Sequence, residues 1–195
     1  MTSKGRPKTF ENNEALSKAQ ELFWEKGYEA TSLSELINHM GISRQSLYNT
    51  FGNKHDLFIK CFETYVEDNH TQLKELFDSD KSAKKKLNEL IKSVTTHAGS
   101  DKGCMISFTI QEMANKDEKV NSILNCKYHR NYDLFHQFFK DALKSEEIES
   151  NLSAKELADL LDSLLLSVTS LCKLPNRSSQ IQNIFKVFLK QIKFK

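Results

Sequence analysis

Only two prolines and six glycines interrupt the 195 residues, and this scarcity of turn-forming residues constrains the fold more than any other feature. Sandwiches and barrels of β-strands need a turn roughly every 8–12 residues, and turns use these two residues. Apolar side chains instead recur at the spacing of helices that are buried on one face. The sequence therefore predicts an all-α protein.

Capping residues and apolar periodicity divide the chain into about nine helices. Ser32-Leu33-Ser34-Glu35 and Ser153-Ala154-Lys155-Glu156 both have the form of a capping box, which marks the start of a helix. Asn53 is a further expected N-cap. The predicted helices span approximately residues 13–26, 33–40, 44–50, 54–79, 82–97, 104–114, 117–144, 154–171 and 178–193.

Residues 31–50 have the dimensions of a helix-turn-helix motif, with Gly41 at the turn. Leu36, Ile37, Ile42 and Leu47 can pack its two helices together. Arginine suits guanine edges, glutamine and asparagine suit adenine edges, and hydroxyl groups suit phosphates. The polar residues left on or near the outside of the second helix are Arg44, Gln45, Ser46, Tyr48 and Asn49. Three further residues at helix starts can hold phosphate: Thr31, Ser32 and Lys54. A helical hairpin with an ordinary polar surface would share this pattern.

A wider set of spaced residues adds to the motif. Ala19, Phe23, Gly27 and Tyr28 keep an Ala-x3-Phe-x3-Gly-Tyr spacing. The densest matches that follow are Thr31-Ser32-Leu33, Gly41-Ile42-Ser43, Ser46-Leu47-Tyr48, Phe51, Lys54 and Leu57-Phe58. In these positions residues 8–66 resemble the TetR/AcrR family of transcriptional regulators. His55 departs from the pattern, because the family usually has Glu or Asp there.

The resemblance implies a one-component regulator of two domains: a TetR-type helix-turn-helix DNA-binding domain at residues 8–68 and a helical ligand-binding and dimerisation domain at residues 69–195. It implies a homodimer on a palindromic operator in double-stranded DNA, and a repressor that a small-molecule inducer releases. By position, Ser43, Arg44, Gln45 and Tyr48 would face the groove and its phosphates. The basic N-terminal arm with Arg6 would reach an adjacent minor groove.

The last two predicted helices carry apolar stripes that are wider than one intramolecular face. Part of each stripe must complete a core inside the chain. The remainder fits a two-fold interface of four helices, which is also where the family dimerises. The expected interface residues are Leu157, Leu161, Leu164, Leu165, Val168, Ile181, Phe185 and Phe188.

Aromatic residues gather on the helix expected at residues 117–144. Most aromatic residues of this kind fill a core, but the phenol groups of Tyr128 and Tyr132 need polar partners when they are buried, so we expect them at a pocket. The residues expected to line an inducer pocket are Phe62, Tyr65, Cys104, Phe108, Tyr128, Tyr132 and Phe135.

Cys104 admits a second hypothesis, a thiol sensor of electrophiles or oxidants, because a helix N-terminus lowers the pKa of a thiol. A small buried thiol is the structural alternative. Cys126 and His129 lie one helical turn apart, but no third and fourth metal ligands accompany them, so we expect no metal.

Several classes of protein are disfavoured by the sequence. It holds no phosphate-binding loop, nucleophile elbow or HExxH motif, so we expect no catalytic residues and no cofactor. A helical enzyme or an adaptor that has lost DNA binding remains an alternative. No apolar run is long enough to cross a membrane, and the four cysteines are scattered without a secretory signal. We therefore expect a cytoplasmic protein.

Overall fold

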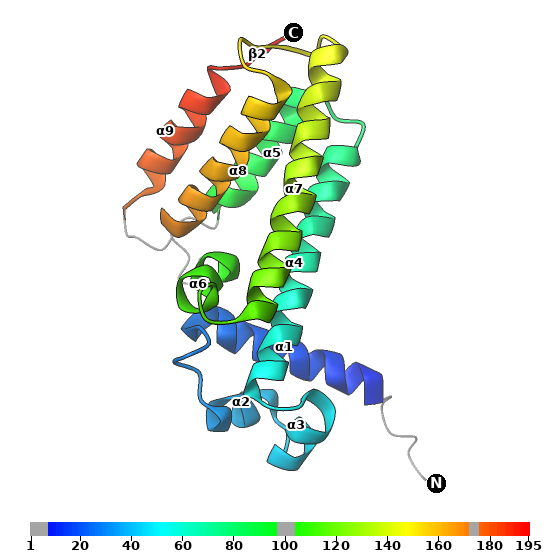
Figure 1. The fold of residues 1–195 in the computed structure, drawn as a ribbon, viewed down its shortest axis with the longest axis vertical. Coiled ribbons are helices and arrows are strands. Elements are labelled where there is room, and N and C mark those ends of the chain that lie inside the picture. Colours follow the sequence, from blue (N-terminus) through cyan, green and yellow to red (C-terminus); the bar gives the residue numbers. More distant parts are fainter. Residues whose placement is uncertain (1–7, 97–103, 172–175) are drawn as a thin grey trace.

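The structure, a computed structural model, describes residues 8–96, 104–171 and 176–195. Two long helices, α4 (Lys54–Asp78) and α7 (Glu118–Lys144), run side by side along the molecule. The short N-terminal helices lie at one end and the C-terminal helices at the other (Figure 1). The prediction of an all-α fold with nine helices is confirmed within the described ranges. None of the described helices is both long and apolar enough to span a membrane.

The N-terminal end contains α1 (Lys8–Lys26), α2 (Leu33–Met40) and α3 (Arg44–Phe51). The starts of α2 and α3 are capped by serine hydroxyl groups. The Ser32 hydroxyl accepts the Glu35 backbone N–H at 3.2 Å, while the Glu35 carboxylate accepts the Ser32 N–H at 2.9 Å. The Ser43 hydroxyl accepts the Ser46 N–H at 3.1 Å, which starts α3. Local hydrogen bonds therefore fix where both helices of the motif begin.

The remaining helices are α5 (Ala83–Thr96), α6 (Met105–Met113), α8 (Ala154–Leu171) and α9 (Ser178–Leu189). α8 packs along α7, and α9 packs on α8 and α5. α6 lies between the N-terminal helices and the C-terminal bundle (Figure 1). It is therefore placed to contact both ends of the molecule.

Two large apolar cores stabilise the two ends. The first joins α1–α4 to α6 and the start of α7, and its largest side chains include Phe23, Phe58 and Phe62. The second joins α4, α5, α7, α8 and α9 around Phe135 and Phe139. Full burial of one such side chain contributes about 1.5–3 kcal/mol, so these contacts hold the helices in place.

Two predicted helix ends are wrong. α1 begins at Lys8, five residues before the predicted start at residue 13. α9 ends at Leu189, and the chain then pairs as β2 (Lys193–Phe194) with β1 (Ile148–Glu149) in an antiparallel ladder. Ile192 continues the apolar period of α9 in the sequence, but in the structure it lies beyond the end of the helix and is buried in the second core. The predicted end of the fifth helix, at residue 97, lies outside the described residues.

Candidate nucleic-acid interface

The helix-turn-helix is held by apolar side chains on the inner faces of α2 and α3. Leu36 and Leu47 expose none of their surface, and Met40 and Phe51 are also buried. Gly41 joins the two helices with a φ of 69°, a left-handed conformation that glycine adopts without strain. The outer face of α3 is therefore fixed in orientation by a packed inner face.

The outer face of α3 consists of polar side chains and one tyrosine. All of the polar side chains expected there are exposed: Ser43, Arg44, Gln45, Ser46 and Asn49. Tyr48 is 46% exposed, and Gln45 donates a hydrogen bond to Asn49 at 2.9 Å. The sequence of α3 contains no acidic residue, so its face carries the single positive charge of Arg44. Such a surface presents hydrogen-bonding groups to DNA without repelling the phosphates.

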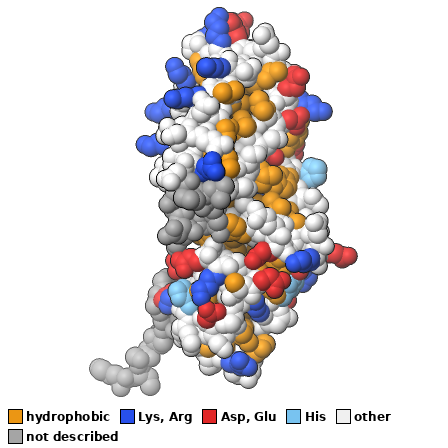
Figure 2. Space-filling view, turned by 90° about the vertical axis from the view of Figure 1, so that its left-hand side faces the viewer, with side chains coloured by type: hydrophobic (Ala, Val, Ile, Leu, Met, Phe, Trp, Pro, Cys, Tyr) orange, Lys and Arg blue, Asp and Glu red, His pale blue; other side chains and the backbone are white. Residues whose placement is uncertain are grey.

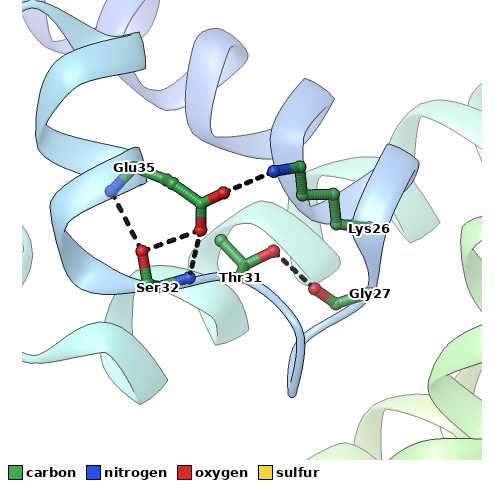
Figure 3. Close-up of polar contacts among 5 residues, drawn as sticks. All are labelled: Lys26, Gly27, Thr31, Ser32 and Glu35. Carbon is green, nitrogen blue, oxygen red and sulfur yellow. Dashed lines mark hydrogen bonds and ion pairs between the residues drawn. The ribbon is translucent and has the colours of Figure 1, made fainter.

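The corner between α1 and α2 is built by local hydrogen bonds (Figure 3). Thr31 is fully buried, and its hydroxyl donates to the Gly27 carbonyl at 2.6 Å. Thr31 therefore supports the corner, whereas Ser32 is exposed at the start of α2. Lys26 pairs with Glu35, and this hydrogen bond, together with the capping contacts of Ser32, lowers the pKa of Glu35 to about 2.

Lys54, the first residue of α4, is half-buried, and its ammonium group lies 4.3 Å from the centre of the Tyr28 ring. Lys60, which the sequence analysis missed, is exposed one turn and a half further on and donates to the Thr50 carbonyl at 3.4 Å. Lys60 thus lies at the C-terminal end of α3, and Lys54 begins the helix that follows it. Arg6 lies outside the described residues.

Two carboxylates from the corner between α6 and α7 contact this end of the molecule. The Glu112 carboxylate accepts the Tyr28 backbone N–H at 2.8 Å, and Asp117 contacts His55. Although burial raises the pKa of Asp117, the backbone N–H of Val120 and the His55 ring lower it below its ordinary value overall. Sequence reasoning missed both contacts, although His55 departs from the residue type usual at its position.

Two cavities lie between α4, α5 and α8; the first also reaches α1, and the second also reaches α7. Their volumes are about 330 and 320 Å³, and they share the lining residues Asn69, Gln72, Ser93, Val94, Cys104 and Thr169. The first extends to Trp24 and Tyr65, and the second extends to Lys127 and Asp162. These volumes are at the lower end of the range that small-molecule sites occupy.

Only part of the expected pocket lines these cavities. Tyr65 and Cys104 line the first cavity, where the Tyr65 hydroxyl lies 4.0 Å from the Cys104 sulfur. Phe62 and Phe135 expose none of their surface and belong to the two apolar cores. Three others are half-buried and line neither cavity: Phe108, Tyr128 and Tyr132.

Polar residues that the sequence did not single out line the second cavity. Burial lowers the pKa of Lys127 and raises the pKa of Asp162. Burial also raises the pKa of the neighbouring Tyr128 to about 12, so its phenol stays protonated at neutral pH. Asn131 is 4% exposed and its amide oxygen lies 3.0 Å from His70 Nδ1. In the sequence, Lys127, Asn131 and Asp162 could have been noticed as polar residues that interrupt apolar helix faces. No group of three or more metal-ligating side chains occurs in the described ranges.

The apolar residues expected at a dimer interface divide into two groups. Six are buried inside the protomer: Leu157, Leu161, Val168, Ile181, Phe185 and Phe188. Leu164 and Leu165 are half-buried, whereas Leu166 and Val187 are 37% and 51% exposed. Hydrophobic side chains also gather in a band on the face seen in Figure 2. Residues without exposed surface cannot contact a partner, so the exposed residues are the ones available for an interface.

A helix-turn-helix with an outward polar helix defines the class of this chain as a DNA-binding protein. Residues 15–61 match the family model described as "Bacterial regulatory proteins, tetR family". The chain is 29% identical over 191 residues to the uncharacterized HTH-type transcriptional regulator YezE of Bacillus subtilis (strain 168), covering 95% of this chain and 97% of YezE. It is 28% identical over 167 residues to the HTH-type transcriptional repressor ComR of Escherichia coli (strain K12), covering 84% and 80%. Residues 15–61 thus form a TetR-type DNA-binding domain, and nearly the whole chain is similar to HTH-type transcriptional regulators.

Solved structures share the whole fold. Reduced NemR from E. coli aligns with a TM-score of 0.86 at 17% identity, covering 95% of this chain and 98% of NemR. A cysteine mutant of the TetR family regulator CifR in complex with a 26-bp operator DNA aligns with a TM-score of 0.79 at 24% identity, with the same coverage. These likenesses extend the agreement from the N-terminal motif to the C-terminal helices.

Proposed function

We propose that this chain is a homodimeric repressor that binds a palindromic operator through α3 and releases it when a small molecule enters the cavities between α4, α5 and α8. The observation that carries the proposal is the outer face of α3, where Arg44 and Gln45 are exposed without a neighbouring acid on the helix. Arg44 and Gln45 read base edges, while Ser43 and Tyr48 contact phosphates. Ser32 and Lys54 hold the backbone on either side.

Selection of binding sites from a random duplex library with the purified protein tests the DNA-binding proposal. We expect an enriched palindrome whose half-sites are about one helical turn apart, or slightly more. Arg44→Ala should relax the preference at one base position per half-site by about 1–3 kcal/mol. Arg177→Ala is a matched control, because it removes an exposed arginine at the start of α9, on the C-terminal bundle rather than on the helix-turn-helix. Failure to enrich any sequence at low salt would refute the proposal.

The dimer proposal rests on the exposed apolar side chains of α8 and α9, chiefly Leu166 and Val187. Two copies related by a two-fold axis would bury these faces against each other in a four-helix arrangement. A glutamate in this interface would be buried without a partner, so Val187→Glu should shift the molecular mass measured by light scattering from dimer to monomer. A wild-type mass equal to one chain would exclude the dimer.

A second candidate for the releasing signal is a reactive electrophile that modifies Cys104, and the position of its sulfur on the wall of both cavities favours it. In this step the Cys104 thiol gives its proton to water, its sulfur forms a bond to the β-carbon of an activated alkene as the carbon–carbon π bond breaks, and the α-carbon takes a proton from water. The adduct would then occupy the cavity as a bound ligand does.

N-ethylmaleimide provides a direct test of this second candidate. We expect it to release operator DNA from the wild type and from Cys126→Ser, which removes an exposed thiol outside the cavities, but not from Cys104→Ser. Burial raises the pKa of Cys61, so that thiol should react slowly. Equal release from Cys104→Ser and wild type would eliminate Cys104 as the sensing thiol.

A further inference from the structure

Glu112, near the end of α6, contacts Gly27 and Tyr28 in the corner between α1 and α2, where the helix-turn-helix begins. One carboxylate oxygen accepts the backbone N–H of Tyr28 at 2.8 Å. The other lies so close to Gly27 that a Cβ at residue 27 would be 2.6 Å from it. The carboxylate therefore occupies space that is open only because residue 27 is glycine.

Gly27 and Tyr28, which Glu112 contacts, are connected to the starts of α2 and α4, whose residues Ser32 and Lys54 face DNA in the proposed function. The Gly27 carbonyl accepts the buried Thr31 hydroxyl, and Ser32, the next residue, caps α2. In the other direction the ring of Tyr28 contacts the Lys54 ammonium group at the first residue of α4. A displacement of this corner would shift the starts of α2 and α4 together.

Asp117 makes a second contact from the same turn between α6 and α7. Its Oδ1 accepts the Val120 N–H at 3.0 Å and thereby caps α7, while its Oδ2 contacts His55, the residue after Lys54. The two carboxylates are five positions apart in the sequence and lie at the two ends of one turn. They thus attach the DNA-binding end to the C-terminal helices at two points.

We propose that Glu112 is a positioning residue for operator binding: its carboxylate, with Asp117 beside it, holds the helix-turn-helix at the orientation that lets both halves of a dimer reach a palindrome. This inference rests on the proposed function. Glu112 itself is on α6, not on the recognition helix, so its effect acts through Tyr28. A loosened corner would leave each motif able to bind one half-site but would cost affinity when two half-sites must be reached together.

The loss of negative charge and the loss of positioning have opposite effects on DNA affinity, so the measured affinity of a Glu112 variant distinguishes them. Removal of a carboxylate near DNA strengthens binding, because it reduces repulsion of the phosphates. Loss of positioning acts in the opposite direction. Glu118→Ala is a matched control. Glu118 is exposed at the start of α7, beside the same turn, and its substitution removes one negative charge, as Glu112→Ala does.

The experiment measures binding to the selected palindrome and to a duplex with one half-site scrambled. We expect Glu112→Ala to bind the palindrome on the order of tenfold more weakly than wild type, which is about 1.4 kcal/mol, with the single half-site unchanged. Glu112→Asp keeps the charge but withdraws the carboxylate from Tyr28, so it should behave like Glu112→Ala while folding more readily. Glu112→Gln keeps an acceptor oxygen and should stay within about twofold of wild type. Glu118→Ala should bind at least as tightly as wild type.

The outcomes separate the two proposals. A wild type that selects no palindrome refutes the proposed function. A wild type that selects a palindrome, with Glu112→Ala and Glu112→Asp equal to it there, overturns the positioning role while the proposed function stands. An equal loss on the palindrome and on the single half-site, accompanied by a lower urea midpoint, would also overturn it, since Glu112 would then act only on folding.

Discussion

Two glycines with positive φ but different surroundings allow the contact of Glu112 to be measured as a free energy. Gly27 and Gly41 have φ values of 82° and 69°. A Cβ at residue 41 would meet no atom within 4 Å, whereas a Cβ at residue 27 would lie 2.6 Å and 2.9 Å from the two Glu112 carboxylate oxygens. Alanine at each position therefore carries the strain of a positive φ, and only one substitution forces a neighbour to move.

Gly41→Ala should destabilise the protein by about 1 kcal/mol, because left-handed strain of about 1–2 kcal/mol is partly offset by a more restricted unfolded chain. Gly27→Ala should cost about 2.5–4 kcal/mol, because the displaced carboxylate also loses its hydrogen bond to Tyr28, worth about 1.5–3 kcal/mol. In combination with Glu112→Ala, the added cost of Gly27→Ala should return to about 1 kcal/mol.

Urea unfolding followed by far-UV circular dichroism measures these four free energies, with wild type as the reference. The double-mutant cycle isolates the interaction between residues 27 and 112 from the backbone strain, which is present in both arms. An equal cost of Gly27→Ala with and without Glu112→Ala would refute the close contact. So would a Gly27→Ala cost that matches that of Gly41→Ala.

Three further predictions follow from the helix-turn-helix. Leu47→Ala should destabilise the protein by about 2–5 kcal/mol in the same urea assay, because it empties a fully buried position between α2 and α3; a smaller cost would show that the site collapses. Lys54→Ala should lower the slope of log affinity against log salt by about one per protomer, and an unchanged slope would remove Lys54 from the phosphate contacts. Glu35 should titrate near pH 2 rather than at its ordinary pKa of 4.5 when its carboxyl carbon is followed by NMR. Because the folded pKa of Glu35 is depressed, its contribution to the start of α2 is complete above about pH 4.5 and is lost as the pH falls toward 2. Lys26→Ala should raise this pKa. A titration of Glu35 near pH 4.5 in the wild type would contradict the Lys26 contact.

The recognition element was predictable because its determinants are local in sequence. Ser32 and Ser43 hydrogen-bond to residues three positions away, and such caps can be read directly from spacing. Once Leu36 and Leu47 are assigned to the inside, the helical period alone places Arg44 and Gln45 outside. The boundary expected after residue 68 stays a prediction, since α4 continues through it without a break.

The cavities and the interface were less predictable because they depend on how several helices meet. Phe135 and Tyr65 are both aromatic residues on long helices, yet one fills a core and the other lines a cavity. The choice depends on gaps between α4, α5, α7 and α8, which no single helix encodes. The apolar stripes of α8 and α9 likewise indicated a wide contact face, but Leu161 and Phe185 face inward, and it is Leu166 and Val187 that remain exposed.

α6 shows why the least predictable contacts bear most on regulation. Cys104, directly before α6, lines both cavities, and Glu112, near its other end, contacts the corner of the helix-turn-helix. The step of eight positions from Cys104 to Glu112 corresponds to a rise of about 12 Å, which a helix of this length spans without a flexible joint. Both contacts join parts of the chain that are far apart in sequence. A ligand that moves the first end of α6 must therefore either displace Glu112 from Tyr28 or carry the corner with it, and both alter how α2 and α4 begin.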